Sequence, residues 1–143
     1  MKKSLLTALI VLIASGYTYA QQKGKQITLI GEVVESQCYI TGLNGPGKGP
    51  SHKECALKSA KGGIPLSILD EKTGTLYLAG QTKKAMAGAN ELLIPLIAEK
   101  VKVTGRVFEK GGMKMILISK VDKVGEENKK QDEKKEQQKE EKK

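Results

Sequence analysis

The chain has 143 residues, of which 38% are hydrophobic and 29% charged, and its formal net charge at pH 7 is +9. A chain of this length holds one modest hydrophobic core, so it is predicted to form a single domain. It contains only one histidine and no tryptophan. It therefore lacks the signature of a serine–histidine catalytic triad and offers few aromatic platforms for stacked nucleic-acid bases.

The N-terminus, residues 1–20, is organised as a bacterial-type secretory signal peptide. Lys2 and Lys3 supply a positive start, and residues 5–14 are uncharged and largely apolar. In residues 18–20, Thr18 and Ala20 place small side chains at positions −3 and −1 of a cleavage site. We predict cleavage before Gln21 and a soluble product exported to the periplasm or the extracellular space. The apolar run is too short for a comfortable membrane span, so the mature chain should have no transmembrane segment. The alternative interpretation is a retained N-terminal anchor.

The folded domain is predicted over residues 26–124, after a short linker at residues 21–25. Apolar and β-branched patterns predict strands over residues 27–35, 64–70, 76–79, 100–109 and 114–122. The first pattern changes phase at Gly31, which predicts a bulge or bend there. Residues 90–99 have helical character with Asn90 as the expected N-cap, and Pro95 should keep this helix short or irregular.

The order of these elements predicts a mainly β fold. Three strands, a helix and two strands (β-β-β-α-β-β), with a long Gly/Pro-rich loop and a short helix after the first strand, form the order of a five-stranded oligonucleotide/oligosaccharide-binding (OB) barrel. Residues 125–143 carry seven lysines and seven acidic residues and are predicted to be a disordered tail, because they have no apolar surface to bury. With two lysines in the leader and a neutral tail, the domain has a net charge of +7.

Several motifs of the chain resemble those of a family of small exported bacterial OB-like proteins of uncharacterised function. They are G-E-V-V-E-S-Q-C at residues 31–38, H-K-E-C-A at 52–56, the glycine pair at 62–63 and V-K-V-T-G at 101–105. Proteins of this look often have another cysteine four residues after the one that matches Cys55. This chain has Ser59 there, which leaves two cysteines, an even number suited to one disulfide.

The candidate functional segment is the run from Cys38 to Gly63, which holds both cysteines and the single histidine. Ser51 and Glu54 match a capping box, which predicts a short helix that begins at His52 and ends at the glycine pair 62–63. Cys55 then lies one turn into the helix, on the same face as His52. This spacing places the histidine and one cysteine side by side.

Three interpretations of this segment remain open. The favoured one is a structural disulfide between Cys38 and Cys55, because exported proteins meet an oxidising compartment; closing this loop should contribute about 3 kcal/mol. The second is a copper or zinc site with Cys38, His52 and Cys55 as ligands, since thiolates and imidazole suit both metals. The third is a thiol redox centre at Cys55, in the first turn of a helix, although the chain has no C-x-x-C motif.

The function predicted from these observations is that of an exported, non-enzymatic OB-like module that binds or supports a component of the cell envelope. The expected partner is an envelope protein, an anionic lipid or a polysaccharide, because the domain is basic. The contact surface would include four lysines of the candidate segment, Lys48, Lys53, Lys58 and Lys61. Nucleic acid is not expected as a partner, because export separates the protein from it and the mature chain has few aromatic residues, Tyr39, Tyr77 and Phe108.

Overall fold

The computed structural model describes residues 23–82 and 88–125. The predicted signal peptide and the predicted tail beyond Gly125 lie outside the described residues, so both stay predictions. Among the described residues, no helix has the length and apolar character that crossing a membrane requires.

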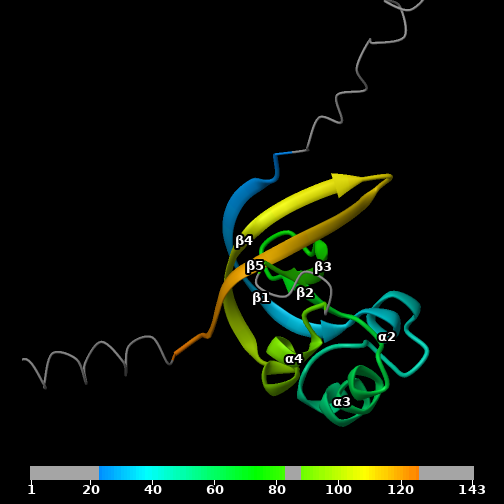
Figure 1. Cartoon of the computed structure of the whole chain (residues 1–143). Coiled ribbons are helices and arrows are strands. Elements are labelled where there is room, and N and C mark those ends of the chain that lie inside the picture. Colours follow the sequence, from blue (N-terminus) through cyan, green and yellow to red (C-terminus); the bar gives the residue numbers. More distant parts are fainter. Residues whose placement is uncertain (1–22, 83–87, 126–143) are drawn as a thin grey trace, which may run out of the picture.

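Five strands form a closed barrel with the neighbour order β1-β2-β3-β5-β4, as the ribbon view shows (Figure 1). Their bounds are β1 Lys25–Glu35, β2 Leu66–Asp70, β3 Leu76–Gln81, β4 Lys100–Lys110 and β5 Met113–Lys123. Neighbouring strands are antiparallel except β3 and β5, which run parallel. The prediction of a mainly β, five-stranded OB-like barrel is confirmed.

Strand β1 closes the barrel because it pairs along its length with two different neighbours. Residues 25–32 pair with β4 and residues 31–35 pair with β2, both without a register shift. Of the predicted bulge or bend at Gly31, the bulge is therefore not formed, although β1 does change partner at this residue; a register shift occurs between Thr104 and Gly105, where β4 pairs with β5. Glycine is needed at position 31 for another reason, because a Cβ atom there would collide with the carbonyl oxygen of Leu69.

The hydrophobic core fills the barrel with the inward-facing side chains of all five strands. The side chains with no exposed surface include Val33, Leu66, Ile68, Val101, Val103 and Ile116. Burying each such side chain contributes about 1.5–3 kcal/mol relative to leaving it exposed. The alternation seen in the sequence of β4 is retained, because its valines at positions 101 and 103 face inward between more exposed neighbours.

Short helices gather at one end of the barrel (Figure 1). They are α2 Ser36–Thr41, the 3₁₀ turn η2 Pro50–His52, α3 Lys53–Lys61, α4 Asn90–Leu93 and the 3₁₀ turn η3 Ile94–Leu96. Helix α3 packs its buried alanines, Ala56 and Ala60, into the same core as Leu93 and Ile97. The helices thus close this end of the barrel. The helix predicted between the third and fourth strands is confirmed, and as expected it is short and irregular around Pro95.

The predicted role of Asn90 as a helix N-cap is wrong. Ala89 occupies that position, without a side-chain cap. The Asn90 carboxamide instead accepts a hydrogen bond from the Leu66 backbone (3.0 Å) and donates to the carbonyls of Ala60 (3.1 Å) and Ile64 (2.8 Å). It binds backbone groups at the end of α3 and the start of β2 and so joins three segments.

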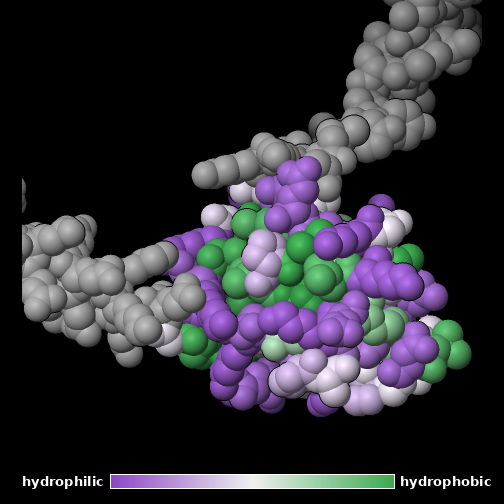
Figure 2. Space-filling model, turned by 90° about the horizontal axis from the view of Figure 1, so that it is seen from below, coloured by the Kyte–Doolittle hydropathy of each residue, from purple (hydrophilic) through white to green (hydrophobic). Residues whose placement is uncertain are grey.

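The surface also carries exposed apolar side chains. Viewed from below, apolar residues gather in the middle of the surface and hydrophilic residues surround them (Figure 2). Two of the most exposed large apolar side chains among the described residues are Ile40 (69% exposed) and Leu43 (75%). Both belong to the segment between β1 and β2, which also holds the candidate site.

Candidate metal centre

Cys38 is positioned by α2, a helix that the sequence pattern did not predict. Glu35, the last residue of β1, is fully buried, and its carboxylate accepts hydrogen bonds from the backbone of Gln37 (2.5 Å) and Cys38 (3.0 Å). A carboxylate at this position satisfies free amides of the first helical turn. Gly42, with φ of 64°, ends the helix and donates to the carbonyl of Cys38. These caps fix Cys38 in a buried position on α2.

His52 and Cys55 are positioned by η2 and α3. The predicted capping box is not formed: α3 begins at Lys53, and its N-cap, His52, makes no side-chain cap hydrogen bond. Pro50 instead opens a preceding 3₁₀ turn. The predicted end of the helix is confirmed, because Gly62 caps α3 after Lys61. The main consequence of the spacing also holds, since His52 and Cys55 come together.

The structure brings Cys38, His52 and Cys55 into one group whose ligand atoms all lie within 4.8 Å of one another. Both cysteines are free thiols. The predicted Cys38–Cys55 disulfide is thus not formed in the structure, because a bond would require the sulfurs to approach to about 2.05 Å. The two sulfurs share this space with the histidine ring. This arrangement matches the second interpretation, a metal site.

The histidine of this group lacks a partner for one ring nitrogen. His52 is 5% exposed. Among the described residues, its Nε2 atom is the one buried side-chain nitrogen or oxygen atom that forms no hydrogen bond. A buried polar atom without a partner costs about 1–3 kcal/mol, and such atoms are rare in folded proteins. A metal ion that bound the two sulfurs and this nitrogen would give the Nε2 atom a partner.

Asn44 is a fourth polar residue at the site, and the sequence reasoning missed it. Its side-chain amide nitrogen lies 3.8 Å from the sulfur of Cys38 and 3.8 Å from that of Cys55. It comes from the loop after α2, which glycines with positive φ, Gly42, Gly45 and Gly47, fold back over the helix. Asparagine in a glycine-rich turn is common for conformational reasons alone, so only the fold reveals this contact.

The electrostatic environment keeps the Cys38 thiol protonated in the metal-free protein. The hydrogen bond with the buried Glu35 carboxylate, together with burial, raises the pKa of Cys38 to about 11, while Asn44 opposes this shift. A thiol of such high pKa is a poor nucleophile near neutral pH. The environment therefore does not favour Cys38 as an activated redox thiol.

The four lysines proposed as a contact surface have different environments. Lys53 binds Glu99 at 2.9 Å, and Lys123 binds the other oxygen of the same carboxylate at 2.9 Å; these two contacts lower the pKa of Glu99. Lys48 lines a cavity next to the loop. Lys58 and Lys61 are exposed in the last turn of α3. The partner that was predicted for these lysines stays a prediction.

Comparisons with known proteins do not place the chain in a family. No protein-family model, curated protein or solved structure matches it. The resemblance to small exported OB-like proteins stays a prediction, and the functional argument rests on the barrel and on the group formed by Cys38, His52 and Cys55.

Proposed function

We propose that this protein is an exported, non-enzymatic OB-like barrel that binds one copper(I) ion through Cys38, His52 and Cys55. The observation that carries the proposal is the convergence of two sulfurs and a histidine nitrogen within 4.8 Å. The unpartnered Nε2 atom of His52 supports it. Two soft sulfur ligands and one imidazole form a donor set that selects copper(I) or zinc over hard cations.

The number of protein ligands favours copper(I) over zinc. Copper(I) is stable with two or three soft ligands, whereas a structural zinc site has four protein ligands. Three metal-ligating side chains converge among the described residues. Zinc would therefore need water or the carboxamide oxygen of Asn44 as a fourth ligand. With copper(I), the Asn44 amide can keep its orientation and donate to both sulfurs.

The surrounding structure holds the ligands in place before any metal arrives. Gly47 is buried, and a Cβ atom there would overlap the backbone of Cys38 and Tyr39. The loop is therefore closed tightly over α2, with Asn44 beside the sulfurs. On the other side, Gly49 donates its backbone N–H to the Glu32 carboxylate (2.5 Å), which anchors the end of the loop to β1. Ligands that are already in position lose little freedom on binding, which strengthens binding.

The same two sulfurs explain why a disulfide and a metal are competing states of one site. In an oxidising compartment, neighbouring thiols tend to form disulfides. A bridge would consume both sulfur ligands and leave His52 alone. Metal binding would in turn protect the thiols, because the ion occupies the lone pairs that attack an oxidant.

The test is a titration of the reduced, metal-free, full-length protein with copper(I) against a coloured copper(I) chelator. We expect one ion per chain in the wild type, and loss of that ion in Cys38→Ser, Cys55→Ser and His52→Ala. The matched control is Ser59→Ala, which changes a side chain one turn after Cys55 and should bind copper(I) like the wild type. Binding that survives Cys38→Ser and Cys55→Ser would contradict the proposal, as would no binding at all.

Two further measurements separate the other parts of the proposal. Zinc under the same conditions should bind more weakly than copper(I), and a preference for zinc would reassign the metal. N-terminal sequencing of the protein recovered from cell fractions should begin at Gln21 in the exported fraction. A sequence that begins at Met1 in the membrane pellet would contradict export and leave the metal site unaffected.

A further inference from the structure

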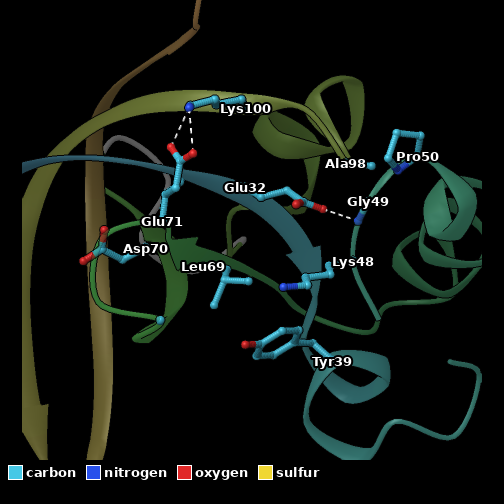
Figure 3. A pocket seen from close by; sticks show the side chains of 12 residues that line it. Glu32, Tyr39, Lys48, Gly49, Pro50, Leu69, Asp70, Glu71, Ala98 and Lys100 are labelled. Carbon is cyan, nitrogen blue, oxygen red and sulfur yellow. Dashed lines mark hydrogen bonds and ion pairs between the residues drawn. The ribbon is translucent and has the colours of Figure 1, made fainter. Parts of the chain in front are cut away.

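A second site lies beside the loop that joins α2 to η2. It is a cavity of about 320 Å³ between the loop, the start of β4 and the β2–β3 turn. Figure 3 labels most of the residues that line it, among them Glu32, Tyr39, Lys48, Leu69, Asp70, Glu71, Ala98 and Lys100. A cavity of this size is at the lower end of the range for small-molecule sites.

Some charged groups of the cavity already have partners. Lys100 binds both oxygens of Glu71, at 2.8 and 2.6 Å (Figure 3). The charges of this pair therefore cancel. The Asp70 carboxylate accepts hydrogen bonds from the Lys72 backbone (3.1 Å) and the Thr73 hydroxyl (2.5 Å), and it points away from Glu32 and Lys48 (Figure 3). One oxygen of Glu32 is bound to the Gly49 backbone. Among the described residues, the Glu32 carboxylate therefore has no cation beside it.

Two donors of the cavity have no partner in the part of the chain that the structure describes. The Lys48 ammonium forms no ion pair there, with Glu32, Asp70 or any other carboxylate, and the Tyr39 hydroxyl forms no hydrogen bond. In the close view both side chains extend toward Leu69, on one side of the cavity (Figure 3). Uncompensated positive and negative groups thus face the same cavity without meeting each other.

The backbone at the cavity wall is also strained. Ala98 has a φ of 59°, and among the described residues no other non-glycine residue has a positive φ. This conformation costs an alanine roughly 1–2 kcal/mol, and such costs persist mainly where they serve a site. The neighbouring structure enforces it, because the Ala98 N–H donates to the Val33 carbonyl at 2.9 Å.

We propose that this cavity binds a small zwitterion of dipeptide size. Its carboxylate would bind the Lys48 ammonium and the Tyr39 hydroxyl, and its ammonium would bind the carboxylate of Glu32. A zwitterion satisfies both uncompensated charges at once, whereas a simple anion or cation satisfies one. The cavity is too small for a folded partner, and this site does not depend on the metal centre.

The experiment adds L-alanyl-L-alanine to the reduced, metal-free, full-length protein and follows backbone amide signals by ¹H–¹⁵N NMR. We expect saturable shifts at Gly49, Leu69 and Ala98, with a dissociation constant of roughly millimolar order, typical of a small ligand. Two matched probes each lack one charge: N-acetyl-L-alanyl-L-alanine lacks the ammonium, and L-alanyl-L-alanine amide lacks the carboxylate. Each should bind about tenfold more weakly, because one charged contact is lost.

Variants assign the two charges to residues. Lys48→Met keeps the side-chain stem and should weaken the dipeptide about tenfold while hardly changing binding of the amide probe, because the lysine's partner is absent from that probe. Tyr39→Phe should give a smaller loss, since it removes one hydrogen bond. Lys58→Met, on the exposed end of α3, is the control and should bind the dipeptide like the wild type.

The outcomes decide the proposal separately from the metal centre. Equal binding of all three probes, shifts outside the cavity, no shifts, or wild-type binding by Lys48→Met would each overturn it. Lys48→Met should still bind one copper(I) ion, and Cys55→Ser should still bind the dipeptide. Failure of copper(I) binding alone therefore leaves this proposal standing, and failure of dipeptide binding leaves the metal proposal standing.

Discussion

The barrel and the segment between β1 and β2 are stabilised in different ways. The barrel is held by continuous backbone ladders and by side chains with no exposed surface, such as Ile68 and Val103. The segment from Ser36 to Gly63 relies on caps, glycine turns and a few polar contacts, and it exposes large apolar residues at its surface. The first arrangement gives stability, and the second can place polar and sulfur ligands that a barrel interior would exclude.

This difference matters because chemistry requires groups that are not yet satisfied. In the barrel, inward-facing side chains are apolar and need no partner. In the segment, His52 has a buried nitrogen without a partner, and Lys48 has an ammonium without a carboxylate in the described chain. Both proposed sites therefore include residues of this segment, and the barrel holds the segment at its two ends.

The largest loss of stability is expected when a core side chain of the barrel is truncated. Ile68→Ala removes a fully buried side chain from β2 and should lower the free energy of unfolding by about 2–5 kcal/mol, through lost burial and the cavity that remains. The matched change in the segment is Leu43→Ala, at a side chain that is 75% exposed, and should stay within about 0.5 kcal/mol. Urea denaturation of both variants measures this. Equal losses would mean that the segment carries as much of the stability as the barrel does.

A smaller effect is expected where the segment joins the barrel. Asn90→Ala removes three hydrogen bonds and leaves the Leu66 amide and two carbonyls without that partner. The expected loss is about 1–3 kcal/mol, the range for leaving a buried polar group unsatisfied. Hydrogen exchange should show faster opening at the end of α3. A loss without this change would mean that Asn90 supports only the barrel.

Relief of backbone strain should act in the opposite direction. Ala98→Gly removes the Cβ atom from a residue with φ of 59° and should stabilise the protein by about 1 kcal/mol or less, because glycine adopts this conformation without cost but is more flexible when unfolded. Thermal unfolding detects the change. If the strain serves the cavity, the variant should be more stable and bind L-alanyl-L-alanine less well; a destabilised variant would show that Ala98 is not strained.

The smallest effect concerns the ion pairs that connect α3 to the barrel. Lys53 and Lys123 lower the pKa of Glu99, so the stabilisation is fully present above the carboxyl's ordinary pKa and is lost as the pH falls through the lowered value. Glu99→Gln should therefore cost less than about 1 kcal/mol at pH 7, as expected for partly exposed pairs. Denaturant curves at several pH values should show the two proteins converging in acid. A difference that grows in acid would contradict this.

The main features of the barrel were predictable because each strand repeats its pattern over many residues. The valines of β4 and the apolar residues of β2 alternate or run together in a way that few other structures allow. The strand order then follows from the known arrangement of five strands and one helix. Single positions were harder: Gly31 was predicted to form a bulge or bend, and the structure has no bulge there but a close contact with Leu69. Sequence alone does not distinguish these uses of glycine.

Strand periodicity and residue chemistry are local properties, so the fold class and the candidate ligands Cys38, His52 and Cys55 were predictable from the chain alone. How those ligands are used depends on tertiary contacts. The Glu35 cap creates α2, the glycine loop brings Asn44 to the sulfurs, and the two cysteines remain thiols that face His52. The tertiary structure also made the cavity of Figure 3, since its charged groups come from β1, the loop, the β2–β3 turn and β4. Contacts between residues so far apart in the chain depend on how the barrel closes, which no local pattern records.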